Sequence, residues 1–331
     1  MPLLRTAGFQ MNNFNHPKIS IIIRTLNEAK YLPECLTSVQ TQLYSGEIET
    51  IIVDSGSTDK TLEIARFYGC KIVEISKQKF TFGRSLNLGC ENGTGDIFVL
   101  LSAHCIPAKN DWLRQLVLPI INGRCQYTYG RQIPRNGVSK YSEGQVFAKY
   151  YPNVSAVPQE GYFCNNANSA IQRKTWLKFR FNEALTGLED MELAKRLISA
   201  GGLIGYVAAS AVEHIHEESW KRIKIRFERE AVALSEIEPN LNLGILQATQ
   251  MFLVALSSDF KSMNSFSVIQ LLEIINYRGC QFWGSFIGSR ASKIRITRMK
   301  NEYFYPKISQ SVIMIGDNDE DDRTSSHESS Q

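Results

Sequence analysis

Two patterns of hydrophobic positions alternate along the first 120 residues. Ile19–Ile23 is apolar except for Ser20, which predicts a strand that is buried on both faces, and Ile48–Val53 is a second run rich in β-branched residues. Between them, segments such as Tyr31–Gln42 place apolar residues at helical spacing. The full series is strand Ile19–Ile23, helix Tyr31–Gln42, strand Ile48–Val53, helix Thr61–Tyr68, strand Lys71–Ile75, helix Arg84–Glu91, strand Ile97–Leu101 and helix Asp111–Leu118. This alternation predicts an α/β fold with an open, mainly parallel sheet flanked by helices.

The regular alternation fades after about Gly123. Residues 127–182 mix short strand candidates with Gly, Pro and Asn, and a clear helix follows at Leu188–Ala200. From Ser219 to about Arg290 the pattern is helical. We therefore expect a flexible leader, an α/β domain, a C-terminal helical extension and an acidic, disordered tail, with bounds at 1–17, 18–235, 236–305 and 306–331.

Charge is unevenly distributed along the chain. The 331 residues are 43% hydrophobic and carry a net charge of only +4, which is too small to indicate a nucleic-acid-binding protein. Six acids and one base lie in 316–331, so the rest of the chain carries +9. Five bases and no acid lie between Arg290 and Lys300. Such a run is either a solvated face or a site that favours an anionic surface or ligand.

Several features favour a cytoplasmic location. The N-terminus lacks the apolar region of a signal peptide, and the seven cysteines are scattered with no C-x-x-C pair. The most apolar stretches, Ile245–Leu256 and Val268–Ile287, are interrupted by polar and charged residues, so they predict buried or interfacial helices rather than membrane spans. With the basic run, they allow peripheral contact with the inner face of the plasma membrane.

Polar segments follow three of the predicted strands, and ligands bind beyond the carboxyl ends of strands in open α/β sheets. These segments are Arg24–Glu28, Asp54–Asp59 and Ser102–Cys105. A carboxylate at Asp54 can accept hydrogen bonds from a ribose or base, or it can simply close a turn. The chain has no G-x-G-x-x-G after the first strand and no P-loop, which removes the main support for dinucleotide-binding and P-loop classes.

The segments Ile21–Glu28 and Ile52–Thr61 together resemble the opening of family 2 glycosyltransferases, which have the nucleotide-sugar-binding GT-A fold. Gly83–Gly89, with Gly95 and Asp96, resembles the Asn-containing helix before the fourth strand of that family. Leu188-Glu189-Asp190 resembles its "ED" motif. The resemblance covers about residues 18–235.

The resemblance implies roles for individual residues. Asp190 would be the catalytic base, with Glu189 orienting the loop or acceptor, and the helix N-terminus would favour an ionised Asp190; alternatively the two acids only cap a helix. Arg84 and Asn87 would lie near the diphosphate or sugar, although Arg84 is as readily a surface arginine. The nucleotide base and ribose would be held by Thr25, Asn27, Glu28 and Asp54.

The metal site departs from the family pattern. Where the family has Asp-x-Asp after the fourth strand, this chain has Ser102-Ala103-His104. His104 either ligates a divalent metal (Mn²⁺ or Mg²⁺), contacts the diphosphate directly, or marks a degenerate site. In His214-Ile215-His216 both imidazoles can point one way in an extended chain. We favour His216 as the second ligand over His214, against the alternative of a polar strand-to-helix turn.

These features predict an inverting glycosyltransferase. Its donor would be a nucleoside-diphosphate sugar and its acceptor a hydroxyl of a glycan or lipid-linked glycan, in cell-surface polysaccharide assembly. The Asn-rich segment Phe163–Ile171 would line the acceptor pocket, or merely satisfy an irregular backbone. Two alternatives are a non-catalytic nucleotide-sugar-binding member of the fold and a sugar nucleotidyltransferase. The latter ranks low because Arg24–Glu28 is not a Gly-rich loop.

Overall fold

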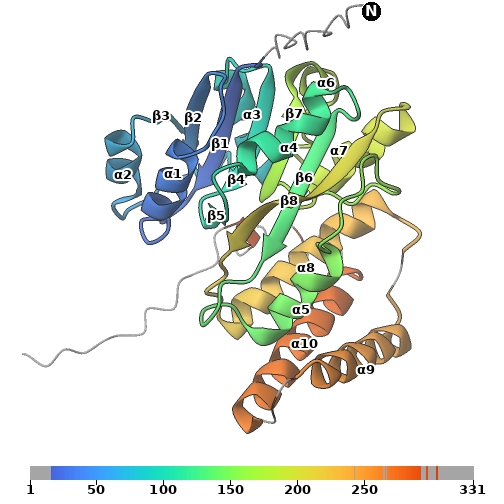
Figure 1. The fold of residues 1–331 in the computed structure, drawn as a ribbon. Coiled ribbons are helices and arrows are strands. Elements are labelled where there is room, and N and C mark those ends of the chain that lie inside the picture. The colour runs from blue at the N-terminus through green and yellow to red at the C-terminus, as the bar shows by residue number, and fades with distance from the viewer. Residues whose placement is uncertain are drawn as a thin grey trace, which may run out of the picture.

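The computed structural model describes residues 16–241, 243–263, 265, 267–291, 296 and 303–304. One eight-stranded sheet, in the order β3-β2-β1-β4-β7-β6-β8-β5, forms its centre (Figure 1). The strands are β1 (Ile19–Thr25), β2 (Ile48–Asp54), β3 (Lys71–Glu74), β4 (Ile97–Ser102), β5 (Cys105–Pro107), β6 (Tyr127–Ile133), β7 (Asn168–Gln172) and β8 (Ile204–His214).

Helices cover both faces of this sheet, as the alternation in the sequence predicts. Side chains of α1, α2 and α4 join one buried cluster, and those of α3, α5, α6 and α7 join another on the opposite face. Ile21 and Ile23 belong to the first cluster and Ile22 to the second. These helices are α1 (Leu32–Gln40), α2 (Thr61–Phe67), α3 (Phe82–Asn92), α4 (Trp112–Ile121), α5 (Tyr141–Tyr150), α6 (Arg173–Phe179) and α7 (Glu189–Ser199).

The register of the sheet brings three strand ends to one level. β1 pairs in parallel with β2 and β4, so that Thr25 lies opposite Asp54 and Arg24 opposite Ser102. The first four strands in order are parallel, while β7 runs antiparallel to both β4 and β6. The α/β prediction is confirmed, with the parallel part of the sheet confined to β1–β4 and the β6–β8 pair.

The helical extension begins as α8 (Trp220–Ile237) and continues as α9 (Ile245–Lys261) and α10 (Val268–Gly288). α10 lies directly against α8. The approach is so close that a Cβ atom added at Gly284 would clash with the carbonyl oxygen of Lys224. At Gly288 it would come within 2.2 Å of the carbonyl oxygen of Glu228. Glycine at these positions therefore permits a backbone contact that any side chain would prevent.

No helix among the described residues is long and apolar enough to cross a membrane. α9 and α10 are helices, as predicted for their sequences. Residues 1–15 of the predicted leader and the whole of the predicted tail, 306–331, lie outside the described residues. The domain bounds stay a prediction.

Candidate active site

The carboxylate pair Glu189 and Asp190 opens α7, directly after Leu188, whose φ of 55° is left-handed. Both side chains are buried, and that of Asp190 is only 6% exposed. The two oxygens of Asp190 accept hydrogen bonds from the backbone N–H groups of Asn166 and Met191, each at 2.8 Å. These bonds fix the carboxylate in place at the edge of the sheet.

Burial, together with the charge of Glu189, raises the pKa of Asp190 to about 7. The helix N-terminus favours the ionised form, as expected, through the backbone N–H of Met191. Desolvation outweighs the two backbone hydrogen bonds, which favour the charged form. A carboxylate with a pKa near neutrality is suited to accept a proton at physiological pH.

Arg24, at the end of β1, faces this pair. Its Nη1 lies 3.7 Å from Oε1 of Glu189, and its guanidinium stacks on the ring of Phe82 at 4.8 Å. Arg229 of α8 also stacks on Phe82, at 4.4 Å. Arg24 is not among the site residues predicted from the sequence, although a charged residue directly after an isoleucine-rich strand is a signal for such a role. It places a positive charge beside the carboxylates.

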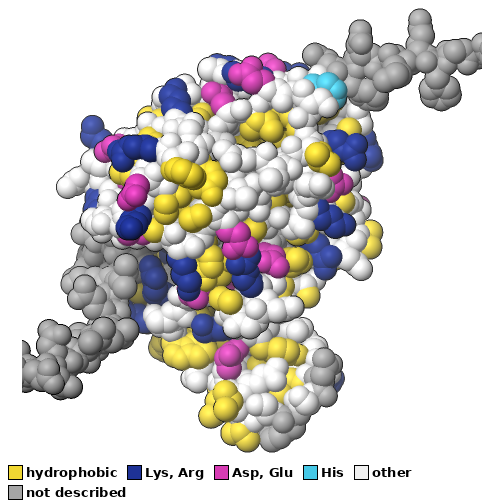
Figure 2. All heavy atoms as spheres, turned by 60° about the vertical axis from the view of Figure 1, so that its left-hand side comes forward, with side chains coloured by type: hydrophobic (Ala, Val, Ile, Leu, Met, Phe, Trp, Pro, Cys, Tyr) yellow, Lys and Arg dark blue, Asp and Glu magenta, His cyan; other side chains and the backbone are white. Residues whose placement is uncertain are grey.

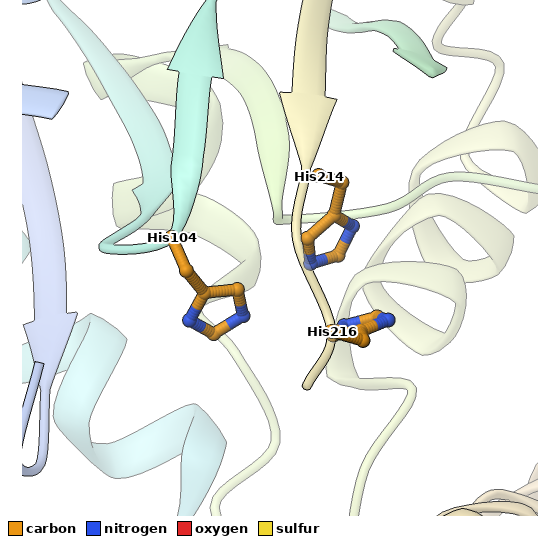
Figure 3. Close-up of side chains that lie close together, drawn as sticks. All are labelled: His104, His214 and His216. Atoms are coloured by element: carbon orange, nitrogen blue, oxygen red, sulfur yellow. The ribbon is translucent and has the colours of Figure 1, made fainter. Parts of the chain in front are cut away.

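Three histidines lie close together beside this edge (Figure 3). His104 comes from the turn between β4 and β5, His214 ends β8, and His216 follows two residues later. Their ring centroids are 4.1 Å apart for His214 and His216, and 5.3 and 5.6 Å from His104 to these two. One ligand nitrogen from each lies within 4.8 Å of the others. The sequence prediction named His104 and His216; the structure adds His214.

Each of these imidazoles is held through Nδ1. The partners are Glu28 for His104 at 3.1 Å, Gln132 Oε1 for His214 at 2.6 Å and Glu143 Oε1 for His216 at 2.7 Å. Because all three partners are acceptors, the neutral form of each ring carries its proton on Nδ1 and has a lone pair on Nε2. This is the usual arrangement of metal-ligating histidines.

The chemistry of the donor set also fits a metal. Nε2 of His214 is buried and has no hydrogen-bond partner among the described residues. Burial, reinforced by His216 and His104, lowers the pKa of His214 well below its ordinary value, which keeps this imidazole neutral. Neutral imidazoles suit transition metals better than magnesium.

Thr25, Asn27 and Asp54, predicted to hold the base and ribose, are linked to one another through a loop. The Asp54 carboxylate accepts hydrogen bonds from Thr25 Oγ1 at 2.8 Å and from the backbone N–H groups of Gly56 and Ser57. Asn27, at a left-handed φ of 57°, accepts from the Thr58 backbone N–H. These residues brace the loop after β2, and their contact with a nucleotide stays a prediction.

Glu28 has a different partner from the one that we expected. Its carboxylate bonds His104, so it orients an imidazole rather than reaching freely toward a ribose. Its backbone N–H donates to Thr61 Oγ1 at the start of α2. The segment after β1 thus supports the histidine cluster as well as the loop after β2.

Asn87 and Arg84 are committed to contacts within the protein. The Asn87 amide oxygen accepts from Trp176 Nε1 and the Phe181 backbone N–H, while its nitrogen donates to the Phe181 carbonyl and Glu183. The guanidinium of Arg84 donates to Glu183 at 2.7 Å. All hydrogen-bonding groups of the Asn87 side chain are used within the protein, and its position near a diphosphate or sugar stays a prediction. Arg84 is exposed and ion-paired.

Replacing Asn87 by Ala is expected to lower the free energy of unfolding by about 3–5 kcal/mol, because it leaves buried donors of Trp176 and Phe181 unsatisfied. Urea unfolding would measure this loss. Asn92→Ala in the same helix removes one bond, to the Leu88 carbonyl, and should cost about 1 kcal/mol or less. Equal stability of N87A and the unmodified protein would refute this structural role.

The segment at Asn165 and Asn166 connects the carboxylates with the histidines. Asn165 Oδ1 accepts from Gln132 Nε2 at 2.9 Å, and Gln132 in turn holds His214. The Asn166 backbone N–H holds Asp190. The predicted acceptor-pocket asparagines therefore position both groups.

A family model described as "Glycosyl transferase family 2" matches residues 20–181. The O-antigen chain rhamnosyltransferase RfbN of Salmonella typhimurium is 27% identical over 216 residues, which are 60% of this chain and 67% of that protein. A dolichyl N-acetyl-alpha-D-glucosaminyl phosphate 3-beta-D-2,3-diacetamido-2,3-dideoxy-beta-D-glucuronosyltransferase of Methanococcus voltae is 38% identical over 104 residues, 29% of this chain and 32% of that protein. The matches thus span about two thirds of the first relative and about one third of the second.

Among solved structures, the mannosyltransferase PcManGT of Pyrobaculum calidifontis, in complex with GDP-Man and Mn²⁺, superposes with a TM-score of 0.58. The superposition covers 86% of this chain and 87% of that one at 15% sequence identity, so it shows a common fold. The fold is therefore of the GT-A class. The match to the family 2 glycosyl transferase model covers the part of this fold from β1 to α6.

Proposed function

We propose that this glycosyltransferase moves a sugar from a nucleoside-diphosphate sugar to an acceptor hydroxyl with inversion at the anomeric carbon, in the assembly of a polysaccharide or lipid-linked glycan. The observation that carries the proposal is the buried Glu189–Asp190 pair, with an Asp190 pKa of about 7. The O-antigen and dolichyl-phosphate names of the two relatives support the class of acceptor.

In this mechanism Asp190 accepts the proton of the acceptor hydroxyl. The oxygen attacks the anomeric carbon as the bond from that carbon to the diphosphate oxygen breaks, and the nucleoside diphosphate leaves with the electron pair. Glu189 keeps the proton affinity of Asp190 high, and Arg24 supplies positive charge beside the pair. Positive charge placed in advance stabilises the departing diphosphate.

The donor would lie over the carboxyl ends of β1, β2 and β4. The loop braced by Thr25, Asn27 and Asp54 would contact the base and ribose. A divalent transition metal would be held by His104, His214 and His216. When bound there, such a metal would neutralise charge on the donor diphosphate. The Mn²⁺ in the complex of PcManGT is consistent with such a group.

A thermal-shift screen with UDP-, GDP-, dTDP- and CDP-sugars, with and without Mn²⁺, tests this proposal. We expect one nucleotide class to raise the melting temperature by about 5 °C at ligand concentrations near 100 times Kd, and the shift to require the metal. The same donor should be hydrolysed slowly or transferred. Binding without hydrolysis or transfer would point to the non-catalytic alternative, and the absence of any shift would contradict the donor class.

A further inference from the structure

α9 and α10 form a helical hairpin (Figure 1). Hydrophobic side chains are exposed on its surface (Figure 2). On α9, Leu246 is 84% exposed, and Leu253 and Phe260 follow at seven-residue intervals, which places all three on one side of the helix. α10 exposes a second stripe, on which Ile269 is 82% exposed. The other members of that stripe are Val268, Leu272, Ile275 and Trp283.

The opposite faces of the two helices make the contacts that hold the hairpin. Asp259 of α9 is buried and bonded to Arg278 of α10 at 2.6 and 2.8 Å and to Ser142 of α5 at 2.6 Å. Ile274 and Tyr277 of α10 are fully buried. The exposed stripes therefore do not contribute to the core of the described residues. Exposed apolar patches of this kind mark interaction sites.

Basic residues outnumber acidic ones across the hairpin and the sequence directly after it, as far as Lys300. Asp259 and Glu273 are the two acids in 239–300, and both are engaged within the protein, because Glu273 accepts the backbone N–H of Tyr141. Lys261 and Arg290 are exposed at the C-terminal ends of α9 and α10. The sequence continues, outside the described residues, with Lys293, Arg295, Arg298 and Lys300.

We propose that the α9–α10 hairpin docks on an anionic membrane surface, with its apolar stripes in the interface and the described bases Lys261 and Arg290 on lipid headgroups. An apolar face that carries exposed bases, and whose two acids are both bonded within the protein, complements such a surface, whereas a protein partner would not need the excess of bases. Trp283 adds an aromatic side chain of the kind that favours the interface. Docking does not depend on the proposed activity. If that activity holds, docking would bring the candidate site near a lipid-linked acceptor, because α8 lies between the hairpin and the site.

Co-sedimentation with vesicles tests the docking. The full chain should bind vesicles of phosphatidylcholine with about 30% phosphatidylglycerol far more tightly than phosphatidylcholine alone, and about 0.5 M salt should weaken the binding. The double variant Leu246→Asp with Leu253→Asp should lose at least about tenfold in partition. Phe67→Asp is the matched control, since Phe67 is 85% exposed on α2, and it should bind like the unmodified chain.

Circular dichroism and the nucleotide-sugar thermal shift show that each variant is folded, so loss of docking is distinguishable from failure of the donor proposal. Absence of binding to anionic vesicles overturns the proposal, as does equal binding by the double variant. Light scattering provides a further test. A dimer that the double variant dissociates would assign the face to a second copy of the chain and would also overturn membrane docking.

Discussion

Replacing Asp190 by Asn should lower turnover at pH 8 by about 10³-fold or more, within the range of general-base contributions, while the donor still binds. The amide keeps the shape of the side chain, but it cannot take the proton of the acceptor hydroxyl. The measurement is kcat with the donor identified by thermal shift, together with the shift itself. Glu192→Gln is the matched control, because Glu192 lies in the same first helical turn and pairs with Arg196. Near-normal turnover in D190N would disprove the base assignment.

The pH profile follows from the same carboxyl. With a pKa of about 7, the rate of the unmodified enzyme should fall about tenfold per pH unit below that value and reach a plateau above it. Stability should move in the opposite direction. Because folding raises the pKa of Asp190 above its ordinary value of 3.8, the protonated form favours the folded state, and that stabilisation is lost as pH rises through about 7. D190N should therefore gain in melting temperature relative to the unmodified protein at pH 8.

A second large effect is expected at the histidines. His104→Ala and His216→Ala should each weaken the binding of Mn²⁺ or Zn²⁺ by about 100-fold or more, because each removes a preoriented imidazole, and even the loss of an orienting partner typically costs 10–100-fold. Isothermal titration calorimetry on the metal-stripped protein gives this readout without any assay of activity. Mg²⁺ should bind much more weakly than either metal, since it prefers oxygen ligands.

His16→Ala is the matched control for these variants. His16 is exposed and packs on Tyr44 at an edge-to-face angle, outside the three-histidine cluster, so its loss should leave metal affinity unchanged. Unaltered affinity in H104A and H216A would show that the cluster does not hold the metal. Preference for Mg²⁺ over Mn²⁺ would likewise contradict a site built from imidazoles.

Much of the fold could be predicted because its signals are local. The runs Ile19–Ile23 and Ile97–Leu101 lie within β1 and β4, since nearly continuous apolar residues suit a strand covered on both faces. α5 and α6 escaped prediction, because Tyr141–Tyr150 and Arg173–Phe179 are short and carry few apolar positions at helical spacing. Their helices depend on packing against the second buried cluster.

The candidate site divides in the same way. The sequence by itself determined the class of fold, the strand ends where we expect a ligand and the presence of Glu189 and Asp190 at a helix start, because these features are encoded by neighbours along the chain. Only the tertiary structure decided that His214 joins His104, that Arg24 faces Glu189 and that Asn87 is a packing residue. It also decided the pKa of Asp190. Burial and contacts between residues about 90 or more positions apart determine these properties. The hydrophobic periodicity of a sequence reports local structure and carries no information on such long-range contacts.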